Sequence, residues 1–281
     1  MHEINFVDES FDLKLASEYH LSIQLGLDGF SFCILDILRK KYLVFRNIPL
    51  IVGKLQFLPR KVEAIFDQEE NLNANFQSVL ISYSTNKATL IPKTFSNPEL
   101  TNRFVALTNE INRNEEIRAD NIPGFNYQVA YSFPKELMSF FNRKYTDYRF
   151  IHKSVPFMAS ALEQRNDKKN SLLINFEKNY IRMIVIKGMQ ITLFNSFYFK
   201  SELDFLYYTL NICQSLQIDP ELDEIMISGQ VADDSGYIRQ LKKYHHNLVF
   251  LKPSAGFTYG KIFEKVQKHQ FISLLNSYSC E

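Results

Sequence analysis

The sequence lacks tryptophan, has only nine glycines and three cysteines, and carries a net charge of only +1. Cys33, Cys213 and Cys280 are odd in number and widely spaced, so neither a disulfide framework nor a zinc knuckle is indicated. The 32 basic residues nearly balance the 31 acidic ones, so no charge excess favours a nucleic-acid backbone or an anionic membrane. We therefore expect no nucleic-acid partner.

Long apolar runs are absent as well. The longest are the size of a strand and are interrupted by charged residues, far short of the roughly 20 residues that a transmembrane helix needs. The N-terminal stretch is acidic where a secretory signal would have a basic segment followed by an apolar one. We expect no membrane span and a cytoplasmic location.

Hydrophobic and aromatic residues are abundant. They provide 46% of the 281 residues, which is enough for the core of one large domain or of two ordinary ones. The 25 phenylalanines and 15 tyrosines fit a core rich in sheets, because aromatic rings pack well on a pleated surface.

A strand–turn–strand pattern occurs twice, in residues 21–36 and 172–187, and a third strand follows each copy. In the first copy, Asp28-Gly29 is expected to form the hairpin turn and to supply the positive φ that tight turns need. An ungapped alignment pairs Leu21 with Leu172, Gln24 with Asn175 and Cys33 with Ile184. A shift of two residues in the next turn pairs Phe45 with Phe194. The alignment predicts two related halves, each with a sheet followed by helices.

The most polar stretch in the middle of the chain, residues 164–170, is the predicted boundary between the halves. We predict an N-terminal lobe with its connecting helix over residues 1–168 and a C-terminal lobe over residues 169–281. A terminal amphipathic helix is expected after Gly260. An alternative interpretation, a plain interaction module with two unrelated β-rich lobes, predicts that the lobes do not superpose.

Two tandem βββ-α units, the second followed by a strand ending in Ser-Gly and by a helix, resemble the actin-like ATPase superfamily. Within it, the chain looks most like an uncharacterised Bacteroidetes family with an actin-like fold. Pilus-assembly and secretion ATPase-like proteins are more distant. The resemblance implies an α/β fold with two lobes, built from duplicated ribonuclease H-like βββαβα units.

In that superfamily, the first hairpin of each lobe carries a phosphate loop of the type Asp-x-Gly-Thr/Ser. Its acid handles magnesium and water, and its glycine lets the backbone approach phosphate. The matching acid positions here are Gln24 and Asn175, and neutral amides cannot replace the charge that holds a hard divalent cation. Gly26 is retained in the first loop, but Leu27 takes the hydroxyl position and Glu177 takes the glycine position of the second loop, where its carboxylate would repel a polyphosphate.

The adenosine-binding turn of the superfamily is a strand followed by Gly-Gly, and Ser228-Gly229 stands at the matching place. An ordinary strand-to-helix junction has the same composition, so both interpretations stay open. The predicted site is a degenerate cleft between the lobes, formed by Gln24, Gly26, Asn175, Ser228 and Gly229, with no catalytic residue and no metal ligand.

We expect a non-catalytic or degenerate actin-like protein that acts as a binding or assembly module, with ATP hydrolysis lost or weakened. This interpretation assigns no cofactor, although ATP bound without strong magnesium binding is compatible with it, and it expects a protein partner or self-association. The alternative is an active nucleotide-dependent ATPase or kinase-like phosphotransferase. In that alternative, unplaced carboxylates such as Asp28 or Glu177 would hold magnesium.

Overall fold

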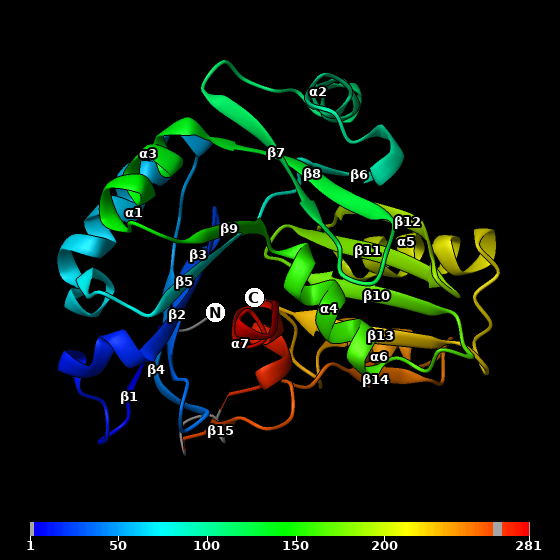
Figure 1. Cartoon of the computed structure of the whole chain (residues 1–281). Coiled ribbons are helices and arrows are strands. Elements are labelled where there is room, and N and C mark those ends of the chain that lie inside the picture. Colours follow the sequence, from blue (N-terminus) through cyan, green and yellow to red (C-terminus); the bar gives the residue numbers. More distant parts are fainter. Residues whose placement is uncertain (1–2, 261–265, 281) are drawn as a thin grey trace.

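The computed structural model describes residues 3–260 and 266–280 of the chain. In this part, the strands form two large sheets and a small one (Figure 1). The first sheet has the order β1-β4-β3-β2-β5-β9, with β15 also paired to β4, and its strands are β1 (Ile4–Val7), β2 (Tyr19–Gly26), β3 (Gly29–Asp36), β4 (Lys41–Pro49), β5 (Ser78–Tyr83), β9 (Arg149–His152) and β15 (Thr258–Tyr259). The second has the order β12-β11-β10-β13-β14, formed by β10 (Ser171–Phe176), β11 (Tyr180–Lys187), β12 (Gln190–Tyr198), β13 (Glu224–Gly229) and β14 (Leu248–Phe250). The small sheet, β6-β8-β7, consists of β6 (Ala88–Pro92), β7 (Glu115–Asn121) and β8 (Tyr127–Pro134).

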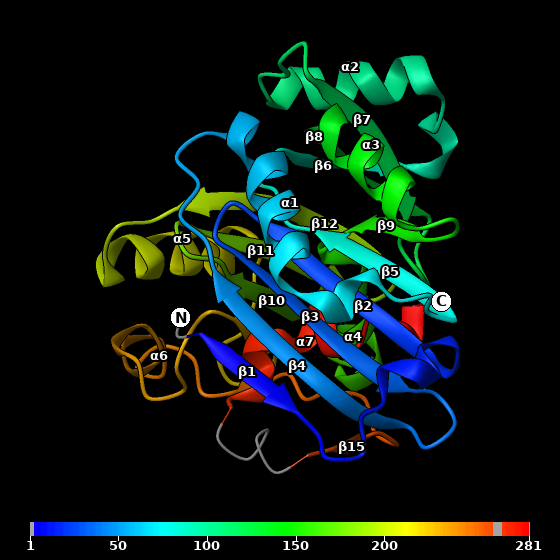
Figure 2. The same ribbon diagram turned by 90° about the vertical axis from the view of Figure 1, so that its left-hand side faces the viewer.

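Helices cover both large sheets and also lie between them (Figure 1). The outer face of the first sheet carries α1 (Leu58–Gln68) and α3 (Lys135–Lys144), and that of the second carries α5 (Glu202–Ser215) and α6 (Gly236–Leu241). Between the sheets lie α4 (Ser154–Gln164) and α7 (Ile272–Leu275), and Figure 2, which looks onto the outer face of the first sheet, shows both behind it. The helix α2 (Pro98–Thr108) lies on the small sheet. Short 3-10 helices span Leu13–Glu18, Leu55–Phe57, Glu70–Asn73, Lys93–Phe95, Lys268–Phe271 and Tyr278–Cys280. Among the helices described, none has the length and apolarity to cross a membrane.

The strand ladders show that the two large sheets repeat the same unit. Cys33 lies opposite Phe45 in the β3–β4 ladder, and Ile184 lies opposite Phe194 in the β11–β12 ladder, so the predicted pairing of these positions is confirmed. In each sheet the next strand along, β5 or β13, joins the first strand of the hairpin in parallel. Because strand order and register both match, the interpretation of two unrelated lobes is wrong.

A bulge occurs at the same place in both units. The register shifts between Ile34 and Leu35 in the first sheet, and between Val185 and Ile186 in the second. These are the positions that the sequence alignment superposes. A bulge adds one residue to one strand of a pair and increases the local twist, so both sheets bend at the same point.

Alternation along the central strands determines which side chains face the space between the lobes. Leu21 and Ile23 of β2 pack in the cluster that includes α1, and Leu172 and Ile174 of β10 pack in the cluster that includes α5 and α6. The intervening side chains point to the opposite faces of the sheets. Near the carboxyl ends of β2 and β10, the side chains on these opposite faces include those of Gln24 and Asn175 from the predicted site.

The C-terminal segment packs on the first sheet, although it follows the second lobe in sequence. The ring of Phe271 meets that of Phe45 edge to face with centroids 4.8 Å apart, and the Tyr42 hydroxyl donates a hydrogen bond to the carbonyl oxygen of Leu275. The core of the first sheet is therefore completed by the end of the chain. The predicted helix after Gly260 lies partly outside the described residues, and the predicted boundary after residue 168 stays a prediction.

Candidate functional site between the two lobes

A cavity of about 410 Å³ lies where the hairpins of the two lobes meet. The hairpin of the first lobe contributes Gln24, Gly26 and Asp28 to its lining, and that of the second contributes Glu177 and Tyr180. The structure thus places Gln24 and Gly26 of the predicted site on the cavity wall. The other three predicted residues lie together at the end of the second sheet, immediately behind Glu177.

A buried ion pair joins the lobes beside this cavity. Lys153, between β9 and α4, places its Nζ 2.7 Å from Oε1 of Glu177, and both side chains are 6% exposed. Asn175 donates from Nδ2 to the same oxygen at 2.6 Å, and its Oδ1 accepts from the hydroxyl of Ser228 at 3.1 Å. The carboxylate of the second hairpin is therefore neutralised by an ammonium group of the first lobe.

The two hairpins also contact each other directly. The carboxylate of Asp28 is half-buried and lies near Glu177 and Lys178 of the second hairpin. Burial and the nearby charge of Glu177 raise the pKa of Asp28. The first hairpin thus touches the second without an intervening ligand.

Further contacts tie the loop after β5 to the second lobe. Arg182, a buried residue of β11, donates from Nη2 to the carbonyl oxygen of Thr85 at 2.6 Å, and its guanidinium lies 4.7 Å from the ring centroid of Phe194. The hydroxyls of Ser84 and Tyr180 are 3.2 Å apart. These contacts hold the two lobes together along one wall of the cavity.

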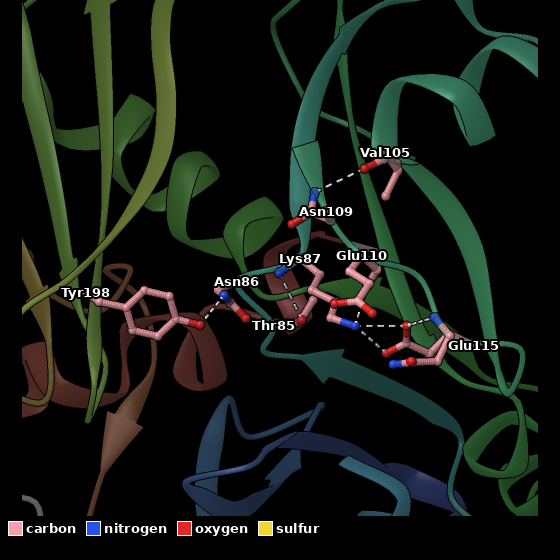
Figure 3. A network of polar contacts seen from close by, with 9 residues as sticks. Thr85, Asn86, Lys87, Val105, Asn109, Glu110, Glu115 and Tyr198 are labelled. Atoms are coloured by element: carbon pink, nitrogen blue, oxygen red, sulfur yellow. Dashed lines mark hydrogen bonds and ion pairs between the residues drawn. The ribbon is translucent and has the colours of Figure 1, made fainter. Parts of the chain in front are cut away.

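The same loop leads from the first sheet to the small one, and its side chains bridge three parts of the molecule (Figure 3). Asn86 donates to the hydroxyl of Tyr198 on β12 at 2.5 Å. Lys87 places its Nζ 2.9 Å from each carboxylate oxygen of Glu115 and donates to the carbonyl oxygen of Glu110 at 2.7 Å. Lys87 lines the cavity, but its ammonium group has its counter-charge within the protein.

The glycines of the predicted site are explained by close packing inside the protein. At Gly229 φ is +88°, and a Cβ there would lie 2.2 Å from the carbonyl oxygen of Phe176. A Cβ on Gly26 would lie 3.0 Å from both Cβ and the carbonyl oxygen of Ser84. For Ser228-Gly229, the geometry supports the interpretation as a structural strand-to-helix junction.

Sequence reasoning missed Lys153, the cation at the centre of the site. It follows a short strand and lies 24 residues before Glu177 in the sequence. No local motif distinguishes it from the other lysines. The only available signal was its position directly after a buried strand that ends at the cleft.

Two lobes with repeated ladders and a cleft between their hairpins define this protein as one with the actin-like ATPase fold. A crystal structure of a protein with this fold and unknown function from Bacteroides thetaiotaomicron is similar, with a TM-score of 0.78 and 22% identity over 88% of this chain and 95% of that one. The structure of the PilM–PilN type IV pilus biogenesis complex has a TM-score of 0.59 and 10% identity over 93% of this chain and 98% of that one. Within this class, the chain belongs to the family described as "Protein of unknown function (DUF3822)", whose sequence model matches residues 8–248. A comparison with curated proteins gave no match.

Proposed function

We propose that this protein is a binding or assembly module that does not hydrolyse ATP in its inter-lobe cleft. The observation that carries the proposal is the buried Lys153–Glu177 pair, with Asn175 bonded to the same carboxylate oxygen. It lies between the hairpins, where the superfamily clasps phosphate. In a nucleotide-binding relative, this place would hold the negative charge of a nucleotide and the positive charge of its metal ion. Here the ammonium of Lys153 and the carboxylate of Glu177 neutralise each other instead.

The residues around the cleft do not fit a magnesium–polyphosphate group. Magnesium is usually bound through one or two carboxylates together with phosphate oxygens. Amides stand at Gln24 and Asn175, Glu177 is engaged by Lys153, and Asp28 has a raised pKa. Within residues 3–260 and 266–280, no group of three or more His, Cys, Asp or Glu side chains is placed to hold one metal ion.

A protein partner is the second part of the proposal. The fold is shared with PilM, whose solved structure is a complex with PilN for type IV pilus biogenesis. That complex supports the proposal that a protein with this fold can act by binding a partner protein. A cytoplasmic location is part of the same proposal and follows from the sequence.

Incubation of the pure protein with ATP and magnesium tests the proposal. We expect no phosphate release above a blank. We also expect no rise in melting temperature. A ligand that did bind, at about a hundredfold excess over its Kd, would add roughly 3 kcal/mol of stability and would raise it. Turnover that is lost in Asp28→Asn and kept in Gly53→Ala would overturn the proposal. It would establish the alternative, an ATPase that uses the carboxylate of Asp28.

A further inference from the structure

We propose that the inter-lobe cavity binds an uncharged, extended peptide segment of a partner protein, with an apolar side chain held at the rim. The inference rests on the proposed function and adds the binding site and the chemistry of the ligand. Three features of the cavity carry it: the internal neutralisation of its charges, its lining of side-chain amides, and its exposed apolar edge.

Both ammonium groups of the cavity already have partners within the protein. The ammonium of Lys153 is bound by Glu177, and that of Lys87 is bound by Glu115. Burial raises the pKa of the half-buried Asp28, which favours its neutral form. A charged ligand would have to compete with these contacts, whereas a neutral ligand meets no unbalanced charge.

Six side-chain amides lie on the cavity wall, more than its four charged side chains. They come from both lobes and from the C-terminal segment: Gln24, Asn47, Asn86, Asn179, Gln230 and Gln270. The Oε1 atom of Gln24 is buried and has no hydrogen-bond partner within the described residues. A carboxamide offers both a donor and an acceptor, which matches the alternating N–H and C=O groups of an extended peptide.

The apolar edge is formed by the hairpin of the first lobe and the loop after β4. Leu27, Val52 and Leu55 line the cavity, and Leu27 is 39% exposed. Ile51, beside Val52, is 86% exposed. The backbone N–H of Leu50 donates to the carbonyl oxygen of Asp28, which holds the start of this loop against the hairpin.

An amide-lined cavity with an apolar edge favours a peptide over a small polar metabolite. A peptide presents backbone amides and apolar side chains at regular spacing, so one segment can satisfy both surfaces. Large apolar side chains left in solvent near a concave site are typical of protein-binding surfaces. The occupant to which we commit is therefore an uncharged segment of a partner polypeptide.

A phage-displayed library of random dodecapeptides provides the probe. Selection against the full-length protein should enrich sequences that lack charged residues and contain at least one large apolar residue. A synthetic, fluorescent copy of an enriched peptide should then show an affinity reduced by about tenfold or more by Val52→Glu and by Gln24→Leu, because the first puts a charge against the apolar side chain and the second removes an amide that binds the backbone. Leu203→Glu is the matched control, because it places the same charge at a 74% exposed leucine on α5, outside the cavity lining.

The outcomes separate this inference from the proposed function. If no peptide is enriched, or if Val52→Glu and Leu203→Glu weaken binding equally, the cavity site is refuted while the absence of ATP hydrolysis stands. Displacement of the bound peptide by ATP with magnesium would instead count against the proposed function, because the cleft would then accept a polyphosphate. Circular dichroism of each variant verifies that a lost affinity does not come from unfolding.

Discussion

Replacement of Lys153 by methionine tests the role of the buried ion pair most directly. Methionine keeps most of the volume of the lysine side chain but removes the ammonium that lies 2.7 Å from Glu177. The carboxylate would then remain buried with the amide of Asn175 as its bonded partner. Removal of one partner from a buried pair costs about 3–5 kcal/mol, and we expect a loss of that size in the free energy of unfolding, measured by urea denaturation with circular dichroism.

The double variant Lys153→Met/Glu177→Leu is the control for the charge. It removes both charges, so most of the lost stability should return, because an apolar replacement of a buried pair is often neutral or stabilising. Arg103→Met is the control for an exposed pair, since Arg103 lies 3.8 Å from Glu99 with 72% and 82% of the side chains exposed. It should leave the free energy of unfolding unchanged. If Lys153→Met costs no more than Arg103→Met, the pair does not hold the lobes together and the reasoning fails.

Two further predictions concern backbone geometry and pH. Gly229→Ala should lower the free energy of unfolding by more than about 2 kcal/mol, because φ is +88° and the new Cβ would overlap the carbonyl oxygen of Phe176. The control is Gly53→Ala, which has open space around the new Cβ and should be nearly neutral in the same urea experiment. Asp120 accepts the backbone N–H of His152 at 2.6 Å, and burial raises its pKa from 3.8 to about 6. A raised carboxyl pKa means that the folded state holds the proton longer than the unfolded one, so the contribution of Asp120 to stability falls as pH rises from about 4 to 6. Asp120→Asn should therefore gain stability relative to the wild type on going from pH 4 to pH 7, and an unchanged difference in urea midpoints would contradict this.

The duplicated architecture could be predicted because it depends on local patterns. Apolar segments on either side of a turn identified the strands of both hairpins, and the alignment of the two copies placed Gln24 and Asn175 at matching positions. The correspondence of Phe45 with Phe194 needed only the alignment and one shift in a turn. Such features depend only on the order of apolar segments and turn residues along the chain.

One local expectation was wrong, and the central contact of the site could not be predicted. Neither Asp28 nor Gly29 has a positive φ, although Asp-Gly is typical of turns that need it. The pairing of Lys153 with Glu177 joins two lobes, so it depends on how the sheets are placed relative to each other. Periodicity carries no information on that arrangement. The prediction that Glu177 would repel a polyphosphate therefore did not include its pairing with Lys153.

The packing of the C-terminal segment has a consequence for how the chain folds during synthesis. Cys33 and Tyr42, on the inner face of the first sheet, contact residues that follow them by 241 and 233 positions. These partners are synthesised long after the first sheet, so its inner face stays uncovered until they emerge from the ribosome. Contacts of such long sequence separation slow folding. The nascent first lobe therefore exposes an apolar surface until residues 271–275 are available, and chaperones that bind apolar surfaces could bind it there.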